Sequence, residues 1–318
     1  MSLAGLLVRR ALLGLATAWV VLTSVFALFT LTEDWVLQGQ VGSARFAGVN
    51  DPEAIEAIRN EYFASRGLDG PLYEVYLEWM ANMATLDWGV SEATGEAVFP
   101  LVTGAVLRTA SYVLPAVVLA ILAGVVIGLY AALRPESRVA NGSVTSAYLL
   151  FALPNFWVGG MAVSLLVGNV IDHPGFLYEH VLPVLLAFTT LLGGYVSYAR
   201  AHSREYAGAD FVTLVRAKGG SSLRVAVHVV RNAAIPFVSM LFTEALGLLV
   251  LAAFVIEVLF GIDGFGLLLL EAVNERDLPV LLGGTVVVIG VGVVGNVLQD
   301  VAYGSLDPRV EVGSRSGN

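Results

Sequence analysis

Cysteine is absent from this 318-residue chain, and lysine occurs only once, as Lys218. Without cysteine there can be no disulfide, no thiolate nucleophile and no cysteine-ligated metal. Charged residues make up only 14% of the chain, whereas a soluble domain usually carries about a quarter. Hydrophobic residues make up 57%, and the mean hydropathy is +0.79. This much apolar surface predicts a membrane protein.

Motifs of nucleotide and metal chemistry are missing too. No Gly-x4-Gly-Lys-Ser/Thr occurs, and Lys218 is followed by Gly219 and Gly220, so the chain has no phosphate-binding loop. There is no His-Glu-x-x-His, and the four histidines are scattered along the chain. We therefore expect no catalytic residue, no metal site and no bound cofactor. The net charge of −9 argues against nucleic acid as a partner. It fits a halophile, and equally an ordinary acidic extracellular loop.

Six apolar stretches are long enough to cross a bilayer, which needs about 20 residues of helix. They are residues 11–31, 106–132, 143–169, 181–199, 235–258 and 281–303. The sequence thus predicts an all-α membrane protein with six transmembrane helices. Its parts would be an N-terminal helix (1–31), an extracytoplasmic loop (32–105), a core (106–303) and a tail (304–318). The first stretch is longer than a signal-peptide core, so we expect it to be retained.

Basic residues set the orientation, because cytoplasmic loops are enriched in them. With the N-terminus in the cytoplasm, 12 of the 17 basic residues lie inside, so both termini are predicted to be cytoplasmic. Segment 200–235 contains an apolar run but also six basic residues. Each of these would cost roughly 2.5–3.5 kcal/mol at the membrane centre, against a gain of roughly 0.3–0.6 for each Val or Leu. The segment is therefore predicted to be cytoplasmic.

The outside loop carries two predicted amphipathic helices. Asp51-Pro52-Glu53 is typical of a helix start, and Ile55, Ile58 and Tyr62 would share one face of that helix. Leu72, Val75, Tyr76 and Trp79 indicate the second helix. Either helix could lie on the membrane surface or form the packed base of the loop, and we favour the packed base.

Segment 200–235 contains the most informative pattern, Asp210 to Gly219. Asp210 is a suitable N-cap, and Gly219 suits the left-handed position that ends a helix. Ser221 or Ser222 could then cap a second helix. The first helix would be short and cytoplasmic, with Phe211, Leu214 and Val215 on one apolar face, and is a plausible docking element for a partner protein.

Polar groups inside the predicted spans are candidates for lining a solute path. Pro154 and Asn155 interrupt the third span, because proline removes a backbone donor and asparagine needs a partner away from lipid. They could line a path or form a packed kink. Glu244 could face a pore or pair with a basic group, whereas Glu257 is expected to hydrogen-bond the loop that follows it. Gly124-x3-Gly128 and Gly160-x3-Ser164-x3-Gly168 are ridges that would let helices approach closely.

The pattern Asp210, Val212, Arg216, Ala217, Lys218, Gly219, followed by Arg231-Asn232-Ala233 and Pro236, resembles the EAA-type coupling loop of ABC importer permeases, in the oligopeptide/dipeptide/nickel branch. Phe211 replaces the family's Tyr, and Val215 replaces its usual Ala. Further segments are similar in order and spacing: 67–72, 87–89, 153–157, 257–266, 274–279 and 306–309. The resemblance thus covers nearly the whole chain.

The resemblance implies a type I permease, one helix plus a five-helix core, in a prokaryotic plasma membrane. Its partners would be a second homologous permease, two cytoplasmic ATPases carrying ATP and Mg²⁺, and an extracytoplasmic solute-binding protein. Coupling to the ATPases would be carried by Asp210, Phe211, Leu214, Arg216, Ala217, Lys218 and Gly219. The solute would be a peptide, a nickel complex or a sugar. The alternative is a stand-alone secondary transporter or channel, for which the sequence offers only Glu244 and no clear repeat.

Overall fold

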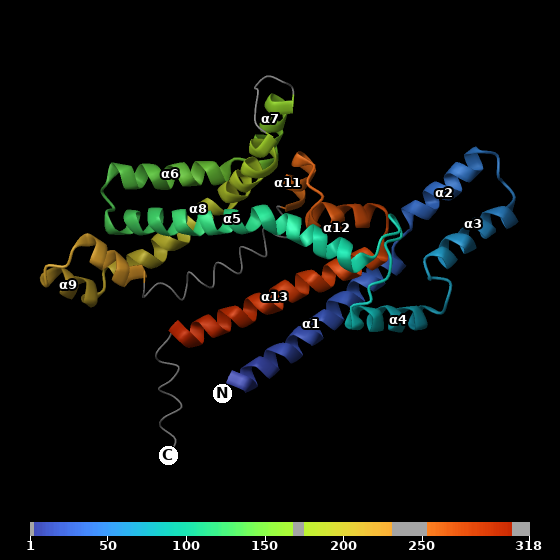
Figure 1. The fold of residues 1–318 in the computed structure, drawn as a ribbon, viewed down its shortest axis with the longest axis horizontal. Coiled ribbons are helices and arrows are strands. Elements are labelled where there is room, and N and C mark those ends of the chain that lie inside the picture. The colour runs from blue at the N-terminus through green and yellow to red at the C-terminus, as the bar shows by residue number, and fades with distance from the viewer. Residues whose placement is uncertain (1–2, 168–174, 231–252, 307–318) are drawn as a thin grey trace, which may run out of the picture. The chain divides into compact units, whose positions relative to one another are not determined.

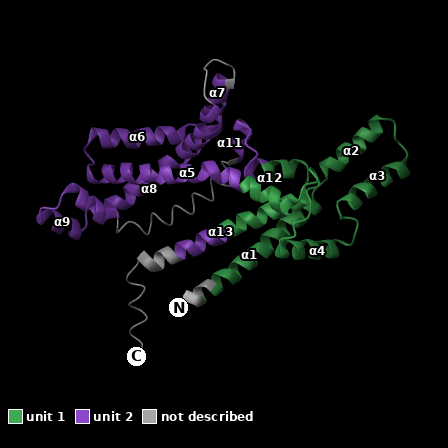
Figure 2. Cartoon of the chain, in the orientation of Figure 1, with its two compact units in different colours: residues 1–106, 268–291 green, residues 107–267, 292–318 purple. Residues whose placement is uncertain are grey.

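The computed structural model describes residues 3–167, 175–230 and 253–306, and within these ranges the chain is helical, with no β-strand (Figure 1). It groups into two compact units, the first formed by residues 1–106 and 268–291 and the second by residues 107–267 and 292–318 (Figure 2). Helices α5 (Val98–Leu133) and α13 (Leu278–Leu306) contribute residues to both units, as does the short α12 described below. This largely helical architecture agrees with the predicted fold class.

The first unit begins with α1 (Leu3–Leu31), followed by α2 (Trp35–Phe46), α3 (Pro52–Ser65) and α4 (Leu72–Thr85). Asp51 caps α3 by accepting a hydrogen bond from the Glu53 amide, 3.2 Å, as its sequence predicts. The predicted face of α3 is covered by α2, since Leu37 and Val41 cluster with Ile55 and Tyr62. The packed-base interpretation of α3 is therefore confirmed, whereas α2 itself had not been predicted.

The second unit contains α6 (Arg138–Ala152), α7 (Asn155–Val167), the π-helix η1 (Leu177–Val181) and α8 (Leu182–Ala207). It continues with α9 (Asp210–Ala217), a helical segment over 222–230 and α11 (Ala253–Phe260). The last helix before α13 is α12 (Phe265–Asn274), which begins in the second unit and ends in the first.

Small residues bring α5 against α8 in the second unit. A Cβ added to Gly128 would lie 2.7 Å from the Arg200 amide nitrogen, and one added to Gly124 would overlap Tyr195. The predicted close approach at Gly124-x3-Gly128 is thus confirmed. Gly160 has open space around its Cβ position, so the second predicted ridge forms no such contact there.

Four helical stretches among the described residues are long and apolar enough to cross a membrane: Val8–Phe46, Val98–Leu133, Leu177–Ala207 and Leu278–Asp300. Helices α6 and α7 pass the same test together and would make a fifth span, but they meet at a bend of 81°. The predicted third span, 143–169, is therefore broken at the position where Pro154 and Asn155 were expected to interrupt it. Pro154 explains the break, because it cannot donate a helical hydrogen bond and disfavours helical geometry in the residue before it. The predicted span 235–258 lies mostly outside the described residues.

Candidate functional site

Helix α9 begins one residue away from the predicted cap. Ala209 occupies the N-cap position with an extended backbone, and its carbonyl accepts a hydrogen bond from the Val212 amide, 2.9 Å. Asp210 is instead the first helical residue and caps no amide with its side chain. The prediction of Asp210 as N-cap is therefore wrong by one position. A carboxylate in the first turn still suits the positive end of the helix dipole.

The end of α9 is fixed by two consecutive glycines. Gly219 has a left-handed backbone with φ +74°, as the sequence predicts. Its amide donates to the Arg216 carbonyl, 2.9 Å, and the Gly220 amide donates to the Val215 carbonyl, 2.9 Å, which is the Schellman pattern. A Cβ on Gly220 would lie 2.7 Å from that Val215 oxygen. The turn thus requires Gly219 for its backbone angle and Gly220 for space.

The inward face of α9 anchors it to the membrane helices. Val212 is only 1% exposed and clusters with Val225 and Val229, which lie on the segment 222–230. Phe211 and Val215 pack against this cluster, together with Leu129 and Leu133 from the end of α5, and with Tyr206. The predicted apolar face is therefore partly wrong, because Phe211 and Val215 face inward but Leu214 does not.

The outward face of α9 is a separate stripe. Leu214 is 54% exposed, and Asp210, Thr213 and Ala217 are exposed as well. These four positions are spaced i, i+3, i+4 and i+7, so they share one face of the helix. We call them the α9 outer stripe. Arg216 and Lys218, also predicted as site residues, are exposed beside it. An eight-residue helix with one buried face and an exposed outer stripe centred on Leu214 is suited to docking another protein.

Segment 222–230 continues from the turn as predicted. Ser221 accepts a hydrogen bond from the Arg224 amide through its hydroxyl, 3.3 Å, and from the Val225 amide through its carbonyl, 3.1 Å. Ser221 is therefore the cap of this helix. The rest of the motif, Arg231 to Pro236, lies outside the described residues.

At the bend between α6 and α7, the side chain of Asn155 makes a hydrogen bond within the protein. Its side-chain amide donates to the hydroxyl of Thr190 on α8, which in turn donates to the Leu186 carbonyl, 2.8 Å. Pro154 begins the new helix, since its carbonyl accepts from the Trp157 and Val158 amides. These contacts secure a polar kink within the second unit. Glu244, the third residue predicted for a solute path, lies outside the described residues.

Glu257 is a fully buried structural anchor of the second unit. Its carboxylate accepts from the Leu267 amide, 2.7 Å, and from the hydroxyls of Thr109, 2.5 Å, and Tyr112, 3.1 Å. The expected hydrogen bond to the following segment is thus confirmed. Gly264 passes so close to the carboxylate that a Cβ there would overlap it. Hydrogen bonding and close packing thus account for Glu257 and Gly264 within the segment 257–266.

Arg276 plays the corresponding role in the first unit. Its guanidinium lies over the rings of Phe29, 4.4 Å, and Trp35, 4.9 Å, and pairs with Asp34, 3.1 Å. It also donates to the Glu33 carbonyl, 2.9 Å. The sequence gives only a weak signal for this centre, namely an arginine within the segment 274–279. In the structure Arg276 has a left-handed backbone, with φ +53°.

Glu92 and Asp277 extend this polar centre of the first unit. Ser91 donates to Asp277, 2.5 Å, and Arg66 lies 2.6 Å from Glu92. Burial raises the pKa of the Glu92 carboxyl to about 7, and the Arg66 charge offsets only part of this. The described residues contain no group of three or more His, Cys, Asp or Glu that could hold a metal ion.

Comparison with known proteins identifies a matching protein family and several relatives. Residues 124–312 match the family described as binding-protein-dependent transport system inner membrane component. The oligopeptide transport system permease protein AppB of Bacillus subtilis is 29% identical over 82% of this chain and 87% of its own length. The dipeptide transport system permease protein DppB of the same organism is 28% identical over 92% and 96%. The metal-staphylopine import system permease protein CntB of Staphylococcus aureus is 27% identical over 83% and 85%.

Proposed function

Because this chain belongs to the family of binding-protein-dependent transport system inner membrane components, we propose that it is a permease subunit of an ABC importer for dipeptides or oligopeptides. The cargo is inferred from relatives named for oligopeptide and dipeptide transport, which align over most of the chain. The observation that carries the mechanism is the α9 outer stripe, an exposed face on a helix whose other face is buried.

The energy would come from other subunits. The sequence has no phosphate-binding loop, so ATP and Mg²⁺ would be held by two cytoplasmic ATPases and this chain would hydrolyse nothing itself. A second, homologous permease would complete the pore, and a solute-binding protein would deliver the peptide from outside. In this assignment both termini and the segment 200–235 lie in the cytoplasm.

Coupling follows from the packing of α9. The outer stripe would insert into a groove on an ATPase, with Leu214 as its apolar anchor and Arg216 and Lys218 beside it. Motion of the ATPase would then pass through Val212 to Val225 and Val229, and on to Leu129 and Leu133 near the end of α5. Because this cluster is packed, displacement of α9 would move the end of α5 with it. Rigid-body movement of this kind can alternate access to a central path.

The solute path would run past the bend between α6 and α7. Pro154 sets the bend, and Asn155 and Thr190 supply polar groups within an otherwise apolar bundle. Glu244 is proposed for the same path from the sequence alone, as a carboxylate within a predicted span.

A second cargo class is supported by one comparison. The relative named for metal-staphylopine import shows that a similar chain serves an importer of a metal complex. Discrimination between the two cargo classes would lie largely with the solute-binding protein.

Uptake by whole cells tests the proposal. A strain lacking this gene should lose uptake of labelled dipeptides, and the intact gene should restore it. Uptake should also stop when the partner ATPase is inactivated. Dipeptide uptake that continues without the ATPase would instead support a stand-alone secondary transporter. Loss of a metal complex alone would support the second cargo class.

A further inference from the structure

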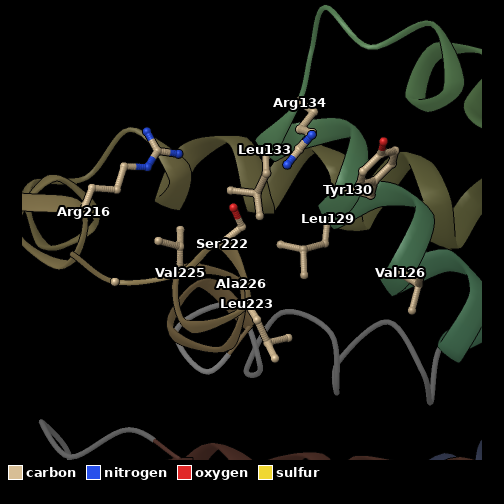
Figure 3. A pocket seen from close by; sticks show the side chains of 11 residues that line it. Val126, Leu129, Tyr130, Leu133, Arg134, Arg216, Ser222, Leu223, Val225 and Ala226 are labelled. Atoms are coloured by element: carbon tan, nitrogen blue, oxygen red, sulfur yellow. The ribbon is translucent and has the colours of Figure 1, made fainter.

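A pocket of about 390 Å³ lies where α5, α9 and the segment 222–230 meet within the second unit (Figure 3). The last turns of α5 form one wall, through Val126, Leu129 and Leu133. Leu223, Val225 and Ala226 form much of the other wall. The pocket is therefore mostly aliphatic, and an aliphatic wall is best filled by an apolar ligand.

Two arginines give the same pocket a charged edge. Arg134, the residue that follows α5, and Arg216 of α9 both line the pocket, and both are exposed. Figure 3 draws both guanidinium groups along the upper edge of the pocket and Leu223 at its lower edge. Among the residues that the structure describes, neither arginine has a carboxylate partner. Two cations without partners on one edge favour an anion with several acceptor oxygens, such as a phosphate.

The surrounding charge favours an anion as well. Between residues 200 and 224 the chain carries five basic residues and two acidic ones. The pocket also adjoins the end of α5, one of the helices long and apolar enough to cross a bilayer. Basic pockets at helix ends are typical binding sites for anionic lipid head groups, whereas free phosphate or a nucleotide would leave the aliphatic wall uncovered.

We propose that this pocket binds an anionic phospholipid, with its phosphate between Arg134 and Arg216 and an acyl chain along Val126, Leu129 and Leu223. The lipid would join α5 to α9, the helix proposed for coupling. The site does not depend on the cargo of the importer, so it can be tested without transport.

Native mass spectrometry of the full-length chain in detergent measures this binding directly. The chain would be titrated with dioleoyl phosphatidylglycerol and, separately, with dioleoyl phosphatidylcholine. We expect the wild-type chain to bind phosphatidylglycerol more tightly. Arg134→Gln should weaken that binding about fivefold, because a basic residue near an anionic lipid contributes about 1 kcal/mol. Arg138→Gln is the matched control, since Arg138, the first residue of α6, is exposed but does not line the pocket, and it should bind as the wild type does.

A second variant tests the aliphatic wall without touching the charges. Ala226→Trp should fill the space and lower retention of phosphatidylglycerol, while inorganic phosphate at millimolar concentration should not displace the lipid. The proposal is overturned if both lipids bind alike, or if Arg134→Gln and Arg138→Gln weaken binding equally. It is also overturned if Ala226→Trp changes nothing. Displacement by inorganic phosphate alone would identify a simple anion site instead.

Discussion

Val212 and Leu214 lie two residues apart on α9 and face opposite environments, with 1% and 54% of their surfaces exposed. Val212 packs against Val225 and Val229, which ties α9 to the second unit. Leu214 belongs to the α9 outer stripe. One short helix thus separates an anchoring face from a face that is free to contact a partner.

The two faces should respond differently to the same substitution. Val212→Asp would bury a carboxylate among aliphatic side chains, so we expect loss of about 3 kcal/mol or more of stability and poor accumulation in the membrane. Leu214→Asp changes an exposed position and should accumulate normally, within about 0.5 kcal/mol of the wild type. Thermal unfolding in detergent and the amount of chain in purified membranes measure both. Equal damage by the two variants would contradict the separation of the faces.

Gly219 should tolerate only residues that accept a left-handed backbone. At φ +74°, Gly219→Val places a β-branched side chain in a conformation that costs roughly 1–2 kcal/mol even for an ordinary residue. We expect transport to be abolished while membrane insertion is kept, because the turn sets the direction of the following helix. Gly219→Asn is the matched control, since asparagine adopts this conformation more readily, and it should retain most transport. Wild-type uptake by Gly219→Val would show that the left-handed turn at Gly219 is not needed for transport.

Local chemistry explains which features the sequence could predict. The end of α9 and the start of α3 follow from residues within a few positions of each other, and both agree with the sequence prediction. For the cap of segment 222–230 the sequence offers Ser221 or Ser222, and the structure has Ser221. The ion pair of Arg276 with Asp34 joins residues that are 242 positions apart in the sequence, so no local sequence pattern predicts it. The sequence groups Leu214 with Phe211 because both are apolar, but the positions of α5 and of the segment 222–230 decide which face of α9 is covered. The site residues and their role in coupling stay predictions.

Arg276 should be the most sensitive charged residue of the first unit. Arg276→Ala would remove the ion-pair partner of Asp34, leaving it only the hydrogen bonds from Tyr62 and Leu37, and would remove the cation that lies against the rings of Phe29 and Trp35. Breaking a buried pair in this way typically costs roughly 3–5 kcal/mol. The thermal unfolding midpoint should therefore fall by several degrees. Arg45→Ala, an exposed arginine of α2, is the control and should change stability by about 0.5 kcal/mol or less. Similar midpoints for the two variants would show that the Arg276 centre is dispensable.

Glu92 should make the first unit less stable as pH rises. Its pKa is about 7 in the folded protein, against an ordinary 4.5, because burial disfavours the charged form in the presence of Asp277 and Asp34, and Arg66 offsets this only in part. The folded state therefore keeps a proton that the unfolded chain releases between these values. The resulting stability is fully present below about pH 4.5 and is lost as pH rises through about 7. Glu92→Gln should flatten this part of the stability curve, whereas Glu96→Gln, at an exposed position, should not. A wild-type curve that rises over the same window would contradict the assignment.

The central claim is that the α9 outer stripe docks an ATPase, and co-purification tests it most directly. The tagged chain would be purified in mild detergent from its own cells, and the proteins recovered with it would be identified and quantified by mass spectrometry. We predict a second permease and ATPase subunits with the wild type. With Leu214→Asp, the ATPase should be lost while the second permease is kept. Val139→Asp, at an exposed apolar position at the start of α6, should keep both. Full recovery of the ATPase with Leu214→Asp, or a chain that purifies with neither partner, would contradict the account.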